Sequence, residues 1–80
     1  MSTKLPRVDC RQVIRALKRA GFEEQRQRGS HLHLHRATDE KRVTVPVHKG
    51  RTVPIGTLRA ILRDADISVD EFHRLLKKSR

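Results

Sequence analysis

Three histidines at alternate positions are the residues of this 80-residue chain best suited to chemistry. His31, His33 and His35 fall in residues 31–36, where two leucines alternate with them. Alternation of this kind predicts a β-strand with the imidazoles on one face, about 6.5–7 Å apart. Imidazole titrates near neutral pH and also ligates metals, so such a face is suited to proton transfer or to holding a metal ion.

Of these two chemistries, proton transfer is favoured. The chain has one cysteine, Cys10, and its acidic residues are predicted in loops and helices away from the histidine strand, so few further zinc ligands are available. A dication also opposes the field of a chain with a formal net charge of +10. We therefore predict no metal and no other cofactor. Metal binding, and histidines that merely fill a solvated sheet face, remain the alternatives.

The charge balance favours a polyanionic partner. Lys and Arg total 19 against 9 Asp and Glu, and Arg outnumbers Lys about two to one, which suits phosphate because the guanidinium is a planar fork. RNA also carries its own nucleophile, the 2′-hydroxyl, so its cleavage needs only a base, an acid and cations around the phosphate. A metal-free ribonuclease is therefore feasible for so small a domain.

Composition also excludes several classes. No apolar run approaches the roughly 20 residues of a membrane span, and an amphipathic membrane anchor is disfavoured because the aromatic residues are only Phe22 and Phe72. The single cysteine and the absence of an apolar leader predict a reducing, cytoplasmic location. Eighty residues leave no room for a second core, so we predict one domain over residues 1–80, with a core at about 7–76 and a frayed tail at 1–6.

Helical patterns flank the histidine strand on both sides. Asp9 is a candidate cap for a helix that ends near Gly21, and the opposite helix face is basic. That basic face comprises Arg7, Arg11, Arg15, Lys18 and Arg19. After a loop over residues 47–56, Pro54 is expected in the first turn of a second helix, and Ser68 with Glu71 forms a capping box before a third.

Short strands are predicted between these helices. Residues 22–28 read as an edge strand, Gly29-Ser30 as a turn, and residues 42–45 as a strand that Pro46 ends. The expected fold is α+β, with a three-stranded antiparallel sheet, helices packed on one face, and the histidines on the open face.

The Gly29-Ser30-His31 motif and the strand after it resemble HicA-type toxins. Two further segments, residues 43–50 (VTVPVHKG) and 56–62 (GTLRAIL), are similar to a second signature of that family at matching spacing. The resemblance covers about residues 9 to 72. It implies a double-stranded-RNA-binding-domain-like fold, in the order α-β-β-β-α(-α). It also implies a metal-independent ribonuclease that cleaves mRNA and halts translation, and a HicB-type antitoxin partner.

The resemblance assigns His31 the role of catalytic histidine. The candidates for RNA contact lie in the Gly-Ser-His turn, in the proline-histidine loop and on the basic helix face. They are Arg28, Gly29, Ser30, His48, Lys49, Arg51, Arg11 and Arg15. Gly29 leaves the backbone open to a phosphate. Two rival functions stay open: a nucleic-acid-binding module without catalysis, and a basic protein that only binds an acidic protein partner.

Overall fold

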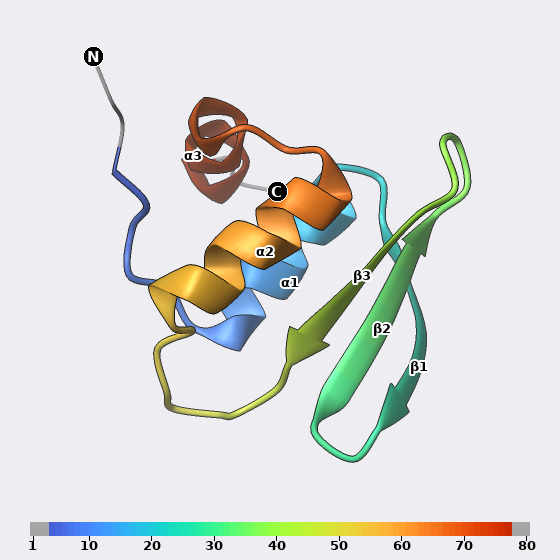
Figure 1. Cartoon of the computed structure of the whole chain (residues 1–80), viewed down its shortest axis with the longest axis horizontal. Coiled ribbons are helices and arrows are strands. Elements are labelled where there is room, and N and C mark those ends of the chain that lie inside the picture. The colour runs from blue at the N-terminus through green and yellow to red at the C-terminus, as the bar shows by residue number, and fades with distance from the viewer. Residues whose placement is uncertain (1–3, 78–80) are drawn as a thin grey trace.

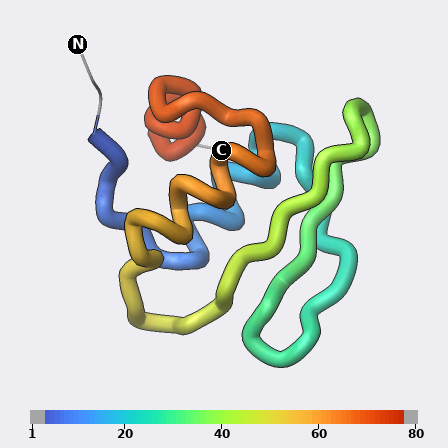
Figure 2. Tube along the Cα trace, viewed as in Figure 1, coloured from blue at the N-terminus to red at the C-terminus, as the bar shows by residue number. Residues whose placement is uncertain are grey.

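The computed structural model describes residues 4–77 and has six elements, which Figures 1 and 2 show from the same side. In chain order they are α1 (Cys10–Arg19), β1 (Glu23–Arg28), β2 (His31–Arg36), β3 (Lys41–Pro46), α2 (Ile55–Ala65) and α3 (Val69–Lys77). The order α-β-β-β-α-α confirms the α+β, double-stranded-RNA-binding-domain-like fold that the sequence predicts.

The three strands form one antiparallel sheet in the order β1-β2-β3. Leu32 lies opposite Val45 and Leu34 opposite Val43, and all four side chains are buried. Because successive residues of a strand point to opposite faces, the histidines of β2 are on the other face, as predicted. The register of β2 therefore divides the sheet into a face that packs on helices and an open face.

The helices lie together on the packed face (Figure 1). α2 lies beside β3, and α1 contacts both β3 and α3. The apolar stripe of α2 (Leu58, Ile61, Leu62 and Ala65) is buried, and Phe72 of α3 is fully buried with it. β1 is different, since all six of its residues are exposed and it lies farthest from the helices. A shift of register between Glu24 and Arg26 marks a bulge in β1.

α1 begins as predicted and differs from expectation on its basic face. The Asp9 carboxylate accepts from the Gln12 backbone N–H at 3.0 Å, and the Gln12 side chain accepts from the Asp9 N–H. Arg19 was expected to join the exposed basic face, but its guanidinium donates to the Leu75 carbonyl at 2.5 Å. It therefore links α1 to α3. Arg7 was also expected on this face, but it precedes the helix. Lys18 is paired with Glu24 at 2.6 Å, so among the described residues Arg11 and Arg15 are the unpaired members of that face.

The ends of α2 and α3 are set by nearby residues as the sequence predicts, except at Pro54. Pro54 was expected in the first turn of α2 and instead immediately precedes it, in an extended conformation with ψ 143°. Asp66 adopts a left-handed conformation after α2, and the Ser68 hydroxyl accepts from the Glu71 N–H at 3.1 Å before α3.

The described part of the N-terminal segment is in contact with the domain. Leu5 packs against the core, and the Lys4 carbonyl lies 2.9 Å from Nε2 of His73 on α3. Residues 1–3 of the tail expected to fray lie outside the described residues, as do residues 78–80.

Candidate active site

Two segments that are distant in sequence meet at one end of the sheet. The Gly29-Ser30 turn joins β1 to β2, and the loop after β3 runs beside it, because the Val47 N–H donates to the Ser30 carbonyl at 2.6 Å. The far end of the loop is held by the Val53 N–H, which donates to the Val8 carbonyl at 2.8 Å. The Gly-Ser-His turn and the proline-histidine loop are therefore brought together (Figure 1, lower end).

The turn itself depends on Gly29. This glycine has φ +58°, and glycine with positive φ at the first central position is typical of a type II′ hairpin turn. A Cβ built on Gly29 would meet no atom within 4 Å. The backbone of the turn is therefore open on the outside, where a phosphate could approach. The Gln27 side-chain amide donates to the Gly29 carbonyl at 3.1 Å and braces the turn from β1.

His31 follows the turn and is exposed on the open face. It lies opposite Arg28 in β1 and opposite Pro46 in β3. Directly opposed side chains have Cβ atoms about 5 Å apart, so the Arg28 guanidinium can reach any group bound at the imidazole. Within residues 4–77 the His31 ring has no hydrogen-bond or ion-pair partner.

The neighbouring histidines of β2 are already engaged. His33 Nδ1 lies 3.0 Å from the Thr44 hydroxyl, and His35 Nε2 lies 3.0 Å from a carboxylate oxygen of Glu40. Both rings are half-buried, whereas His31 is exposed. Of the three imidazoles on this face, the one in the Gly-Ser-His motif is the one with both ring nitrogens available.

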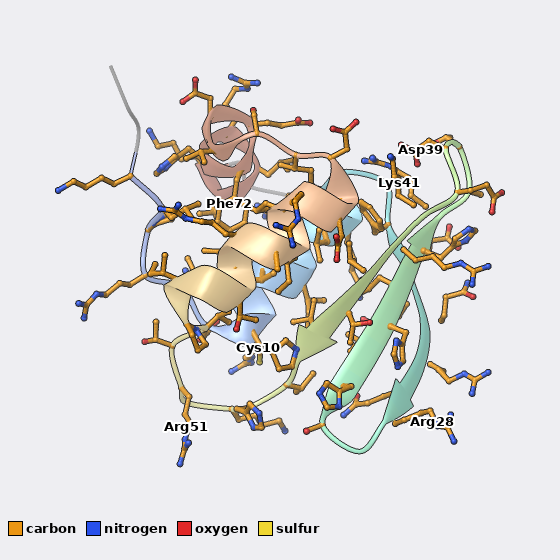
Figure 3. The ribbon with its side chains drawn as sticks, in the orientation of Figure 1. Cys10, Arg28, Asp39, Lys41, Arg51 and Phe72 are labelled. Atoms are coloured by element: carbon orange, nitrogen blue, oxygen red, sulfur yellow. The ribbon has the colours of Figure 1, made fainter. Side chains whose placement is uncertain are left out.

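The loop beside the turn presents cations. The Arg51 N–H donates to the His48 carbonyl at 3.2 Å, and Gly50 between them has φ +77°, as the third residue of a type II turn requires. Lys49 is at the tip of this turn. His48 and Arg51 also line a small pocket of about 170 Å³ whose floor includes Cys10. In Figure 3, Arg51 extends from the loop on the left of the lower part of the molecule, and Arg28 extends from the β1–β2 hairpin on the right.

Arg11 and Arg15 lie on a separate element. Both are exposed on α1, and the backbone bridge between Asp9 and Thr52 puts the start of that helix next to the loop. Arg11 is in the first turn of α1, and Arg15 is about 6 Å farther along its axis. They extend the basic surface away from the turn rather than joining the group around His31.

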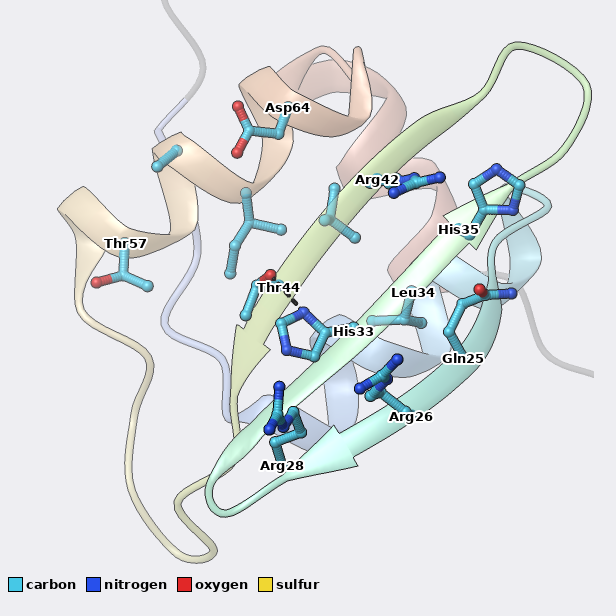
Figure 4. A pocket seen from close by; sticks show the side chains of 13 residues that line it. Gln25, Arg26, Arg28, His33, Leu34, His35, Arg42, Thr44, Thr57 and Asp64 are labelled. Atoms are coloured by element: carbon cyan, nitrogen blue, oxygen red, sulfur yellow. Dashed lines mark hydrogen bonds between the residues drawn. The ribbon is translucent and has the colours of Figure 1, made fainter.

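A groove on the open face contains residues that the motif analysis missed. It has a volume of about 540 Å³ and runs between β1 and α2 across the sheet, as Figure 4 shows. Its lining includes Arg26, Arg28, His33, Arg42, Thr57 and Asp64. Strand alternation carried the signal, since Val43 and Val45 facing the helices force Arg42 and Thr44 onto the histidine face. We call this feature the open-face groove.

The residues with shifted pKa values lie at the opposite end of β2. A hydrogen bond from the Arg36 guanidinium is the main cause that lowers the pKa of Asp39, and the same contact raises the pKa of Arg36. Within residues 4–77, no group of three or more His, Cys, Asp or Glu side chains is placed to hold a metal ion.

Together the fold and the surface define a small, strongly basic α+β protein whose fold is like that of double-stranded-RNA-binding domains. A family model described as the HicA toxin of bacterial toxin-antitoxin systems matches residues 10–67, which is more than half of the chain. The chain belongs to the HicA toxin family, which confirms the resemblance found in the motifs. Membership implies an antitoxin partner. No curated protein matches the chain. None of the described helices is long and apolar enough to cross a membrane.

Proposed function

We propose that this toxin is a metal-independent endoribonuclease that cleaves mRNA in the cytoplasm, with His31 as the general base. One observation carries the proposal: the His31 imidazole is exposed and has no bonding partner among residues 4–77, and it lies opposite Arg28 at the end of the sheet where the cationic loop is attached. An imidazole in this state can accept a proton from a bound substrate without first breaking a contact within the protein.

The proposed reaction uses the RNA's own hydroxyl. A ring nitrogen of His31 takes the proton of the 2′-hydroxyl as the 2′-oxygen attacks the adjacent phosphorus. The bond from phosphorus to the 5′-oxygen breaks, and an acid returns a proton to that oxygen. The products are a 2′,3′-cyclic phosphate and a 5′-hydroxyl end. His48 is the candidate acid because its loop is attached to Ser30.

Cations around the turn would stabilise the charge that builds up on the phosphate oxygens. Arg28, Lys49 and Arg51 are exposed and unpaired within the described chain. The Ser30 hydroxyl and the open backbone at Gly29 can add hydrogen bonds to a phosphate oxygen. Arg11 and Arg15 on α1 supply further contacts to the RNA backbone, which raise affinity without contributing to the chemical step.

The test is RNA cleavage by chelator-treated protein carrying His31→Ala. Removing a general base lowers the rate by about 10²- to 10⁴-fold. The matched control is His73→Ala on α3, which removes a histidine outside the group and should keep the rate of the parent protein. Product ends are read by mass, and a 2′,3′-cyclic phosphate is expected.

Three outcomes would contradict the proposal. Full activity of His31→Ala would exclude this histidine as the base. Loss of activity in chelator, restored by added metal, would overturn metal independence. RNA that is retarded but intact would favour a binding module without catalysis.

We also propose a HicB-type antitoxin as the partner that neutralises the toxin. A surface that gathers unpaired cations around His31 favours a cover rich in carboxylates. Co-expression with the product of a neighbouring gene encoding a small acidic protein should abolish RNA cleavage and yield a stable complex. A complex that leaves cleavage unchanged would contradict this part of the proposal.

A further inference from the structure

The open-face groove is a cationic surface next to His31. It is bounded by β1 on one side and by α2 on the other, and its floor is the histidine face of β2 and β3 (Figure 4). Its volume of about 540 Å³ is in the range of sites that bind ligands. Arg28 lines this groove and also lies opposite His31, so the groove is continuous with the candidate active site.

The arginines of the groove have no carboxylate partners. Arg26, Arg28 and Arg42 are exposed and make no ion pair or side-chain hydrogen bond with any described residue. Other basic residues do find partners, since Lys18 of α1 pairs with Glu24 of β1, and Arg36 of β2 pairs with Asp39. Asp64 lines the groove from α2, on the helix side, opposite the β1 side that carries Arg26. The groove therefore offers several guanidinium forks to an anionic ligand.

We propose that the open-face groove binds a single-stranded segment of the RNA, adjoining the bond cleaved at His31, mainly through its phosphates. This inference rests on the proposed ribonuclease function and adds to it where the flanking nucleotides lie. Residues on one face of a strand repeat about every 6.5–7 Å, so Arg28 opposite His31 and Arg26 opposite His33 form two successive rungs. A backbone laid along them leads directly to the imidazole.

The shape of the groove favours a single strand over a duplex. A base-paired helix is a rigid, convex cylinder, and β1 and α2 would hold it off the floor of the groove, where Thr44 and His33 lie. A single strand can bend into it. Phe22 and Phe72 are both buried, so bases have only imidazole and guanidinium planes to stack on. Recognition by phosphate contacts and such planes predicts binding that tolerates many sequences.

The experiment measures binding separately from cleavage. The probe is a short, fluorescently labelled 2′-O-methyl RNA, which lacks the attacking hydroxyl and so stays intact whether or not His31 is a base. Arg26→Gln and Arg42→Gln should each weaken binding about five- to tenfold and reduce the slope of log K against log salt by about 0.7, the value for one lost phosphate contact on a single strand. Arg74→Gln on α3 makes the same charge change outside the groove and is the matched control.

Each outcome decides the inference. It is supported if both groove variants bind more weakly than Arg74→Gln and if the single strand binds more tightly than a duplex of the same sequence. It is overturned if the groove variants match the control, if the duplex binds as well, or if a polyglutamate peptide displaces the RNA at equal charge, which would assign the groove to an acidic protein. Circular dichroism of each variant establishes that it is folded. Failure of His31→Ala to lose cleavage would refute the proposed base and leave this binding result intact.

Discussion

The two ends of β2 use arginine in opposite ways. At the C-terminal end, Arg36 is half-buried on the packed face and its guanidinium donates to the Ala20 carbonyl at 3.0 Å and to the Ala65 carbonyl at 2.9 Å. It also pairs with Asp39 at 2.8 Å and lies 4.5 Å from the centre of the Phe22 ring. This one side chain ties the end of α1, the end of α2 and the β2–β3 hairpin together.

Beside the N-terminal end of β2, Arg28 at the end of β1 has none of these contacts. It is exposed, lies opposite His31, and has no carboxylate partner among residues 4–77. The residue type is the same, so the difference comes from what surrounds it. Carbonyls at the ends of α1 and α2 accept from Arg36, whereas Arg28 makes no hydrogen bond or ion pair with its side chain among residues 4–77. We infer that the first end stabilises the fold and the second end is left unsatisfied for a ligand.

The largest effect that tests this comparison is on stability. Arg36→Ala leaves two partly buried carbonyls without a donor and removes the contact with Phe22, so we expect a loss of about 3 kcal/mol in the free energy of unfolding. Arg28→Ala should change it by less than about 0.5 kcal/mol. Urea denaturation followed by circular dichroism measures both values.

Arg36→Lys is the control for charge alone. It keeps the cation and loses the fork that serves two carbonyls and a carboxylate at once, so it should recover only part of the lost stability. Equal stability losses for Arg36→Ala and Arg28→Ala would contradict the division between the two ends.

The next effect compares one glycine from each end. Gly21 has φ +103°, and a Cβ there would lie 3.2 Å from Cδ of Arg36, so Gly21→Ala should cost about 2–3 kcal/mol of stability. Gly29 has φ +58° and open space around it, so Gly29→Ala should cost about 1 kcal/mol. Thermal unfolding ranks the two variants.

Asparagine separates backbone conformation from access at Gly29. Asn tolerates positive φ better than Ala does, so Gly29→Asn should be the more stable variant, while its side chain still projects where we place the phosphate. We therefore expect RNA cleavage to fall more than stability does. A Gly29→Asn protein with unchanged cleavage would show that this turn needs no open backbone.

Most of the fold was predictable because it follows local signals. The alternation of Leu32 and Leu34 with the histidines defines β2 to the residue, and Asp9 and Gly21 mark the two ends of α1. These signals depend on neighbours in the sequence, and the apolar periodicity reports which face is buried. The Gly-Ser-His turn and a loop were also visible in the sequence. The loop was predicted over residues 47–56, whereas α2 already begins at Ile55. The attachment of the turn to the loop through Ser30 and Val47 was not visible.

The role of Arg19 and the open-face groove could not be predicted from the sequence, because both depend on contacts between elements distant in the chain. Arg19 reads as part of a basic helix face, and only packing of α3 against α1 brings the Leu75 carbonyl within reach. Arg26 and Arg42 are unremarkable as strand residues. They line one groove because β1 and β3 flank β2 and because α2 lies beside β3. The roles of His31 and its neighbours remain predictions that the cleavage assay decides.

The smallest expected effect is on how stability depends on pH below neutrality. The hydrogen bond from Arg36 lowers the pKa of Asp39 in the folded state, so the ionised carboxylate is favoured by folding. A carboxyl group whose pKa is lower in the folded than in the unfolded state adds stability at pH values above its unfolded-state pKa of about 3.9. That stability is lost as the pH falls from about 3.9 through the folded-state pKa. Asp39→Asn cannot titrate. Urea midpoints measured from pH 7 to pH 3 should therefore fall more steeply for the parent protein than for Asp39→Asn, and the two curves should converge at the acid end. Parallel curves would mean that the Arg36–Asp39 contact does not contribute to stability, and that the backbone carbonyls alone hold Arg36 in place.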